Sequence, residues 1–363
     1  MRFQDEFRDR KLVAIMAENI RSMAAQLDRP VNFMEVCGTH TMSIYQYGLR
    51  SLLPDRVRLV SGPGCPVCVT PIGFVDQALA CAADRNTIVA TFGDMLRVPG
   101  STTSLMEQRA LGADIRIVYS PLDAVALAAD NPDRQVVFLG VGFETTAPAV
   151  AASILEAARR GLGNYCVLAS HKTMPMAMEI LTSDPELKLG GYLCPAHVST
   201  VIGGNAYLQL AEKHHIPCVV TGFEPADVMQ GIEMLLAQTL AGASRVEIQY
   251  RRAVSWEGNA KARTVIDRVF IPSDAAWRGL GTLPGSGLSI RPELAVFDAE
   301  QRLGLAGITG TENRACRCGD VLKGKLSPFD CPLFGTACTP EAPVGACMVS
   351  SEGTCAAAYK YGR

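Results

Sequence analysis

The chain contains 363 residues, of which 48% are apolar and 19% are charged, a composition that supports a sizeable core and excludes a disordered or fibrous protein. At about 150 residues per domain, this length predicts two or three domains. The 34 lysine and arginine residues against 36 aspartate and glutamate residues give a net charge of −2, so no overall positive field attracts nucleic acid or anionic lipid.

Residues 5–27 carry apolar side chains at helical spacing, which predicts an amphipathic N-terminal helix that ends before Pro30. The N-terminus mixes both charge signs and lacks the apolar core of a signal peptide. No stretch of about 18 uninterrupted apolar residues occurs in the chain. We therefore expect a cytoplasmic protein that binds no membrane.

Short apolar runs typical of β-strands then alternate with helix-sized segments. Continuous apolar strands separated by helices indicate parallel sheet with helices on both faces, so we expect an α/β protein. The segments 136–155 and 217–236 resemble each other, because each runs from an apolar strand through Gly-Phe-Glu into a helix. The expected strands cover residues 31–36, 57–61, 87–92, 115–120, 136–141 and 165–170.

The character of the sequence changes near residue 240, where we expect a new domain. Residues 246–255 and 264–273 look like strands, whereas residues 279–292 hold many glycines and prolines and look like a loop. Residues 316–355 contain six cysteines, five glycines and four prolines. Because these residues leave little room for regular elements, the tail needs something other than apolar burial to hold its shape, and covalent or metal cross-links are the candidates.

Cysteine spacing in the tail favours an iron-sulfur cluster. Thiols of a cytoplasmic protein are kept reduced, so a disulfide framework is not expected. A zinc ribbon uses paired cysteine knuckles and here only the first pair is close, whereas a cluster accepts four thiolates from irregularly spaced loops and leaves two for dithiol chemistry. Zinc and plain buried thiols remain alternatives, and the spacing does not select the four ligands. The six cysteines are Cys316, Cys318, Cys331, Cys338, Cys347 and Cys355.

The first expected strand ends at Cys37, which is followed by Gly38, Thr39 and His40. A cysteine that opens onto a helix N-terminus near a histidine is expected to have a lowered pKa, which suits a metal ligand or a nucleophile. The alternative is a buried cysteine with His40 acting as a helix cap.

The second expected strand ends in a loop that contains Cys65 and Cys68. A C-x-x-C motif after a strand in an α/β protein is typical of thiol-disulfide exchange, and the flanking glycines and prolines predict a tight turn. The alternative is a zinc site that Cys37 and His40 complete.

Further polar residues follow other expected strands. Because ligands of open parallel sheets bind at the carboxyl ends of the strands, these residues are placed where a site is expected. A loop ion pair, a helix cap and ordinary structural hydrogen bonding are the alternatives. No Walker-type motif and no GxGxxG motif supports nucleotide binding. The residues are Asp94, Arg97, Glu144, His171 and His197.

Motifs spread over most of the chain resemble the HypD family of hydrogenase maturation proteins. They include CGTH at 37–40, GPGCPVCVTP at 62–71, TFGDMLRVPG at 91–100, GFETTAP at 142–148, PAHVSTVIG at 195–203 and the cysteine-rich tail. The resemblance implies a scaffold on which the Fe(CN)2CO unit of NiFe-hydrogenase is assembled, together with a HypC-type chaperone and a HypE-type cyanide donor.

The resemblance also implies two related α/β domains, which we expect at residues 31–120 and 121–240. It implies a third domain that carries a 4Fe-4S cluster in surroundings similar to those in ferredoxin:thioredoxin reductase. We expect this domain to consist of the N-terminal helix in residues 1–30 and of residues 241–363.

Carried onto this chain, the resemblance assigns roles to individual cysteines. It makes Cys37 the thiolate that binds iron, with His40 near it, and makes Cys65 and Cys68 a redox pair. It further implies that Cys318 and Cys347 form a dithiol beside the cluster. The cluster ligands that it implies are Cys316, Cys331, Cys338 and Cys355.

These roles form one hypothesis. Release of cyanide from a protein thiocyanate takes two electrons, which could pass from the cluster through the tail dithiol and the Cys65–Cys68 pair to the iron site. Asp94, Glu144 and His197 are candidates for proton handling. Two rival readings are a free-standing iron-sulfur thiol-disulfide reductase that acts on a thioredoxin-like protein and a structural zinc protein.

Overall fold

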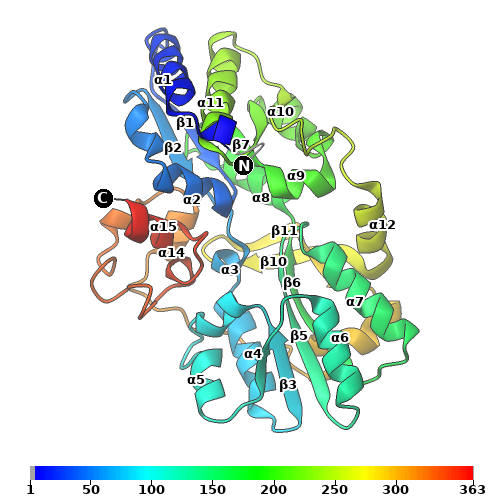
Figure 1. Cartoon of the computed structure of the whole chain (residues 1–363). Coiled ribbons are helices and arrows are strands. Elements are labelled where there is room, and N and C mark those ends of the chain that lie inside the picture. The colour runs from blue at the N-terminus through cyan, green and yellow to red at the C-terminus, as the bar shows by residue number, and fades with distance from the viewer. Residues whose placement is uncertain (1–4, 363) are drawn as a thin grey trace.

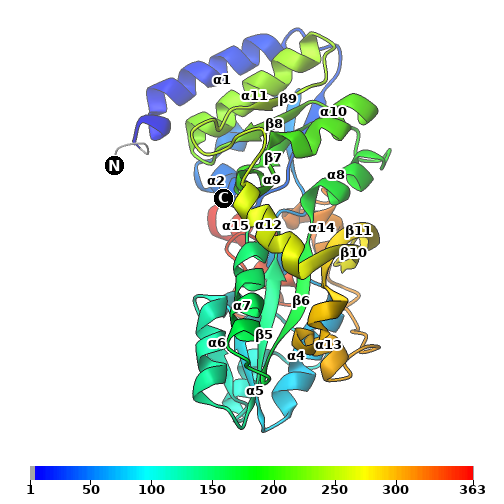
Figure 2. The ribbon, with the colours of Figure 1, turned by 90° about the vertical axis from the view of Figure 1, so that its right-hand side faces the viewer.

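The computed structural model describes residues 5–362, so residues 1–4 and 363 of the expected third domain lie outside the described part. Figures 1 and 2 show two lobes stacked along the long axis of the molecule, each built on one sheet. The cysteine-rich tail lies between them at one side. Along residues 5–362, no helix is both long and apolar enough to cross a membrane.

The upper lobe in Figure 1 contains a five-stranded sheet in which all strands are parallel. Its order is β2-β1-β7-β8-β9, so the carboxyl ends of these strands meet at one edge. The strands are β1 (Val31–Glu35), β2 (Val57–Ser61), β7 (Leu189–Pro195), β8 (Cys218–Thr221) and β9 (Val246–Ile248). The helices are α1 (Arg10–Ala24), α2 (Gly38–Gln46), α8 (Met174–Thr182), α9 (Ala196–Ile202), α10 (Leu208–His214) and α11 (Pro225–Leu240).

The lower lobe contains a six-stranded sheet of order β10-β11-β6-β5-β3-β4. Strands β3 to β6 are parallel, whereas β10 and β11 form an antiparallel hairpin added to β6. The strands are β3 (Thr87–Thr91), β4 (Ile115–Ile117), β5 (Gln135–Gly142), β6 (Tyr165–Lys172), β10 (Phe270–Trp277) and β11 (Gly281–Ile290). The helices are α4 (Ile72–Ala83), α5 (Leu105–Ala110), α6 (Pro121–Asp130), α7 (Ala147–Arg159), α12 (Ala260–Val269) and α13 (Ala299–Arg302).

Short elements complete the chain. Helix α3 (Pro66–Val69) contains Cys68 and follows Cys65, and the tail contains α14 (Cys318–Leu322) and α15 (Thr354–Tyr361). The 3-10 helices are η1 (Asp5–Arg8), η2 (Leu49–Leu52), η3 (Gly93–Arg97), η4 (Gly204–Tyr207), η5 (Pro292–Phe297), η6 (Pro328–Asp330) and η7 (Ala346–Met348).

The α/β class and all six strands expected before residue 171 are confirmed, as are the two strand-turn-helix units at 136–155 and 217–236. Three later expectations are wrong in whole or in part. Of the expected strand at 246–255, only Val246–Ile248 is a strand, β9. Residues 264–269 lie in α12, because Asn259 caps a helix whose apolar residues face the lower sheet. Most of the expected loop at 279–292 is β11. It pairs with β10 from Gly281 to Leu283 and again from Gly287, and Gly285, which like Gly281 has a positive φ angle, lies in the irregular stretch between these two parts.

The two sheets do not correspond to the two ranges, 31–120 and 121–240, into which the α/β region was expected to divide. Strands β3 and β4 from the first range lie in the lower sheet, and β7 and β8 from the second range lie in the upper sheet. The chain therefore passes from the upper lobe to the lower lobe and back. Each sheet combines strands from distant segments, which together form the apolar faces that the helices cover.

The tail and the N-terminal helix also differ from the expected third domain. Cys318, Cys338, Cys347 and Cys355 belong to a core that the tail shares with β7, β8 and α8 of the upper lobe. Ala346 and Val349 pack into the core of the lower lobe, so no separate third domain is seen among the described residues. Helix α1 packs on α11 instead of on the tail.

The contact between α1 and α11 predicts a large difference between two isoleucines of one helix. Ile20 is fully buried, whereas Ile15 is 60% exposed. We expect Ile20→Ala to lower the free energy of unfolding by about 2–5 kcal/mol because it leaves a cavity, and Ile15→Ala to change it by less than about 0.5 kcal/mol. Urea unfolding followed by circular dichroism measures both, and equal effects would contradict this docking of α1.

Candidate functional site

Three loops meet at the carboxyl edge of the upper sheet. The loop after β1 carries Cys37, and the loop after the neighbouring β2 approaches it so closely that a Cβ atom on Gly64 would lie 2.3 Å from the backbone nitrogen of Cys37. The Gly38 N–H also donates to the Gly64 carbonyl at 3.0 Å. The third loop comes from the tail, where Glu352 Oε1 accepts a hydrogen bond of 2.6 Å from the Thr39 hydroxyl. Glycine is required at position 64 because no side chain fits.

Cys37 stands at the N-cap of α2, as expected, but its predicted low pKa is wrong. Only 6% of the residue is exposed. Its pKa is raised to about 12, mainly by burial and also by the charges of Glu352 and Glu35, against hydrogen bonds from the amides of Thr39 and His40 that lower it. Loss of water around the sulfur therefore outweighs the helix N-terminus. A thiolate at this depth needs a cationic partner.

His40 is fixed on the end of β8 and does not cap a helix. Its Nε2–H donates to the carbonyl oxygens of Thr221 at 2.9 Å and Gly222 at 3.0 Å. The side chain is fully buried, and this burial lowers its pKa to about 4, so the ring is neutral. Within residues 5–362, Nδ1 has no hydrogen-bond partner. His40 therefore presents one free lone pair beside the Cys37 loop.

His197 joins the same edge from α9. Its ring centroid lies 4.1 Å from that of Phe223, and the ring of His40 lies 5.0 Å from Phe223, so one phenyl ring contacts both imidazoles. His197 is exposed, and desolvation lowers its pKa while the Glu352 charge opposes that change. Of the histidines expected at strand ends, His197 thus lies in the site.

Cys65 and Cys68 are joined by a disulfide at the start of α3. Both are buried, and the Cys68 N–H contacts Cys65 Sγ at 3.2 Å. While this disulfide is formed, Cys65 and Cys68 cannot bind zinc, because sulfurs in a disulfide offer no thiolate. The Cys68 sulfur also lies 3.9 Å from the carbonyl oxygen of Ala346 in η7, so the disulfide touches the tail.

The tail cysteines face one small enclosed cavity. Its other walls include Val321, Leu333, Phe334 and Met348, so the cavity is lined by thiols and apolar groups. A set of soft donors in dry surroundings fits an iron-sulfur cluster. Along residues 5–362, no three His, Cys, Asp or Glu side chains converge as tightly as a single metal ion requires. The cysteines that line the cavity are Cys316, Cys318, Cys331, Cys338, Cys347 and Cys355.

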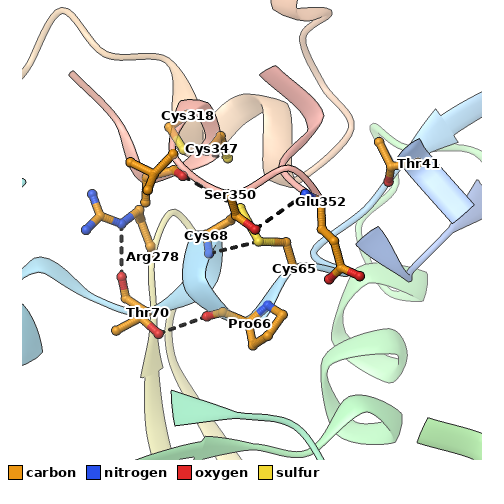
Figure 3. The surroundings of a disulfide bond; sticks show 12 residues. Thr41, Cys65, Pro66, Cys68, Thr70, Arg278, Cys318, Cys347, Ser350 and Glu352 are labelled. Carbon is orange, nitrogen blue, oxygen red and sulfur yellow. Dashed lines mark hydrogen bonds between the residues drawn. A yellow bond between two sulfur atoms is a disulfide. The ribbon is translucent and has the colours of Figure 1, made fainter. Parts of the chain in front are cut away.

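The tail sulfurs continue toward the disulfide. The Sγ atoms of Cys318 and Cys347 lie 2.8 Å apart, and Cys347 belongs to η7, which contacts α3. Figure 3 shows Cys318 and Cys347 on one side of the Cys65–Cys68 disulfide and Glu352 on another. The structure thus brings the tail dithiol and the disulfide into one neighbourhood.

Other residues expected at strand ends have different surroundings. Arg97 donates to two tail carbonyls, those of Pro340 at 3.3 Å and Val349 at 3.1 Å. This contact anchors the tail, and Arg97 forms no ion pair with Asp94, which is exposed.

Glu144 and His171 lie away from the cysteines. Glu144 is buried and Oε1 accepts a hydrogen bond of 2.9 Å from the Met174 amide, so it caps α8 instead of the helix that follows it. His171 is buried against Phe270 at 5.2 Å, and neither ring nitrogen has a partner within residues 5–362. Within the described residues, no hydrogen bond, ion pair or ring contact joins Glu144, His171 or Asp94 to Cys37.

Sequence reasoning missed two acids of the site. Glu35 is fully buried two residues before Cys37, where it accepts a hydrogen bond of 2.7 Å from the Thr41 hydroxyl and burial raises its pKa to about 7. A single acid in the apolar run VNFMEV was the available signal. Glu352 stands between the last two tail cysteines, but nothing in the local pattern indicates that it reaches Thr39.

The close approach at Gly64 gives a test of the loop packing. We expect Gly64→Ala to push the two loops apart, to lower the melting temperature and to increase the alkylation rate of Cys37, measured by mass spectrometry. Gly163→Ala is the control, because its added Cβ meets nothing within 4 Å. If Cys37 in Gly64→Ala reacted no faster than in the unsubstituted chain, this contact would not be what shields the thiol.

The buried Glu144 carboxyl predicts a pH-dependent stability. Desolvation raises its pKa from 4.5 to about 7. Below about pH 4.5 the carboxyl is protonated in both the folded and the unfolded chain and costs no stability, whereas the free energy of unfolding falls as pH rises from there through about 7. The melting temperature of Glu144→Gln minus that of the unsubstituted chain should grow from about pH 5 to about pH 8. Glu156→Gln should show no such growth, because Arg159 lowers the pKa of that carboxyl. A flat difference for Glu144→Gln would contradict the role of burial.

Comparisons with known proteins agree on one family. The family model described as "HypD: Hydrogenase formation hypA family" matches residues 11–362. The chain is 49% identical to hydrogenase maturation factor HypD of Azotobacter vinelandii, over 100% of this chain and 97% of that protein. It is 46% identical to hydrogenase maturation factor HypD of Escherichia coli, over 99% of this chain and 98% of that protein. The chain therefore belongs to the HypD family of hydrogenase maturation factors.

Proposed function

We propose that this maturation factor is a redox-active scaffold on which the Fe(CN)2CO group of NiFe-hydrogenase is assembled in the cytoplasm, with a HypC-type chaperone and a HypE-type cyanide donor. The observation that supports this proposal best is the meeting of the Cys37 loop, the Cys65–Cys68 turn and the cysteine-rich tail at one sheet edge. An assembly site needs a soft metal donor and a source of electrons within reach of each other.

Cys37 is the proposed donor to the iron substrate. Fe(II) that carries carbon ligands prefers soft donors, and a cation supplies the charge that a buried thiolate lacks at this position. His40 presents a free Nδ1 near the Cys37 loop while its Nε2–H is held by the end of β8. In the proposal, His40 orients the Cys37 loop or accepts a proton from it.

The Cys65–Cys68 pair supplies the electrons for cyanide release. The tail dithiol of Cys318 and Cys347 reduces the Cys65–Cys68 disulfide by thiol-disulfide exchange. The Cys65–Cys68 bond breaks to give two thiols and a disulfide forms between Cys318 and Cys347, so atoms and electrons balance. The reduced pair then gives two electrons and two protons to a protein thiocyanate. The sulfur-carbon bond breaks, the donor sulfur leaves as a thiol, cyanide passes to iron, its proton is released and the disulfide re-forms.

The six thiols that line the small cavity are a donor set suited to a 4Fe-4S cluster, and the proposed ligands are Cys316, Cys331, Cys338 and Cys355. When bound, such a cluster supplies electrons one at a time. Cys338 and Cys355 are buried, whereas Cys316 and Cys331 are partly exposed. Arg97 holds the tail in place through the carbonyls of Pro340 and Val349.

Replacing both cysteines of the turn tests the proposal. We expect Cys65→Ala with Cys68→Ala to lose transfer of cyanide to iron, because no dithiol then supplies the two electrons. The measurement is infrared spectroscopy of the cyanide bands after anaerobic mixing of the full chain, its small partner and a thiocyanate-loaded donor.

Cys81→Ala is the matched control, because Cys81 is a buried thiol in α4 outside the site. Transfer at the normal rate in the double variant would overturn the redox role. Disulfide reduction of a thioredoxin-like protein, with no cyanide band on iron in any variant, would instead support a free-standing reductase. A colourless anaerobic preparation that contains zinc would support a structural zinc protein.

A further inference from the structure

A cavity outside the cysteine site lies at the amino edge of the upper sheet. Its volume of about 700 Å³ is that of a site for a small molecule. Among the described residues, no cysteine lines it. Figure 2 shows α11, whose last residues line the cavity, in the part of the upper lobe that is remote from the lower lobe. The lining consists of residues 26–32, Arg58, residues 188–190, Thr239 and Leu240.

The register of the sheet brings residues of this cavity together. Arg58 of β2 pairs with Asn32 of β1, and Asn32 pairs with Leu189 of β7. Residues that pair across neighbouring strands have their side chains on the same face, so these three side chains share one face of the sheet. Because neighbouring strands lie about 4.8 Å apart, the backbones of Arg58 and Leu189 are about 10 Å apart. Lys188 directly precedes Leu189, so the long side chains of Arg58 and Lys188 start within reach of one ligand.

Three cationic side chains line the cavity without a partner. Arg29, Arg58 and Lys188 are exposed to solvent. Within the part of the chain that the structure describes, the side chains of these three residues form no hydrogen bond and no ion pair. Among the same described residues, Asp28 is the only acid of the lining. Three positive charges against one negative charge leave the lining with a net charge of +2.

Lys188 has a left-handed backbone conformation, with a φ angle of 45°. The Asn32 side-chain amide donates to the carbonyl oxygens of Leu187 at 3.2 Å and Lys188 at 3.5 Å, which fixes this backbone beside β1. Glycine adopts such a conformation without strain, whereas a residue with a Cβ atom does so at a cost in free energy. A lysine at a position that favours glycine indicates that its ammonium group has a role at this cavity.

We propose that this cavity binds a small molecule that carries a phosphate group, which is held by Arg29, Arg58 and Lys188. A phosphate monoester carries a charge of about −1.5 to −2 at pH 7, which matches the net charge of the lining, whereas a single carboxylate would neutralise only half of it. Guanidinium and ammonium groups donate charge-assisted hydrogen bonds to phosphate oxygens. Leu27 and Leu240 also line the cavity and offer apolar contacts to the rest of the molecule.

The cavity and the cysteine site lie at opposite edges of one sheet. Strand β1 starts at Val31, which lines the cavity, and ends at Glu35, two residues before Cys37. A bound phosphate therefore lies at the amino end of the strand whose carboxyl end leads into the Cys37 loop. The site goes beyond the proposed scaffold function and does not depend on it.

Calorimetric titration of the full chain with inorganic phosphate and, separately, with acetate tests this site. The titrations are made at low salt, because salt screens exposed charges. We expect phosphate to bind more tightly than acetate. Lys188→Gly should weaken phosphate binding at least about tenfold, which is the loss of one charge-assisted contact, and Arg58→Gln should have a similar effect. Lys261→Gln should leave the affinity unchanged, because Lys261 is an exposed lysine of α12 outside the cavity.

The folded state of Lys188→Gly is checked by its melting temperature without anion, which should not fall, because glycine adopts the positive φ angle of this position without strain. If this variant does not fold, Arg58→Gln carries the test alone. Absence of phosphate binding, or unchanged affinity in a folded cavity variant, would overturn the proposal. An equal loss in Lys261→Gln would also overturn it, and acetate that binds as tightly as phosphate would overturn the assignment to a phosphate.

Discussion

The site depends on the close contact between the backbones of Gly64 and Cys37. A Cβ at position 64 would lie 2.3 Å from the Cys37 nitrogen, and the Gly38 N–H bonds to the Gly64 carbonyl across the same contact. Parallel pairing of β1 and β2 brings both loops to one edge of the sheet. The lone thiol of one loop and the disulfide turn of the other therefore belong to one site, although Cys65 lies 28 positions after Cys37 in the chain.

The tail acts as a bridge between the lobes. Its cysteines pack into the core of the upper lobe, and Ala346 and Val349 pack into that of the lower lobe. Glu352 binds the Cys37 loop through Thr39. A tail with few regular elements is thus held by contacts with two sheets, and its dithiol lies next to the Cys65–Cys68 turn. In the proposed mechanism, this arrangement lets electrons gathered in the tail reach the iron substrate without crossing solvent.

The sequence indicates much of the fold and part of the site. Apolar strands and the motifs at their ends predict the α/β class and place Cys37, Cys65 and His197 at a sheet edge, because strand periodicity and loop position are local properties. The raised pKa of Cys37 could not be predicted, since it depends on burial and on Glu352, a residue over 300 positions away. The exchange of strands between the two sheets is likewise set by long-range pairing, which local pattern does not encode.

The most direct test of the central claim is infrared spectroscopy of the anaerobically purified chain with the proposed HypC-type chaperone, compared with Cys37→Ala. The account predicts that cyanide and carbonyl bands of a low-spin iron appear in the unsubstituted chain and vanish in Cys37→Ala, while the brown absorbance and acid-labile sulfide of the tail persist in both. Bands of equal strength in Cys37→Ala, or protein reconstituted without oxygen that holds no acid-labile sulfide, would contradict it.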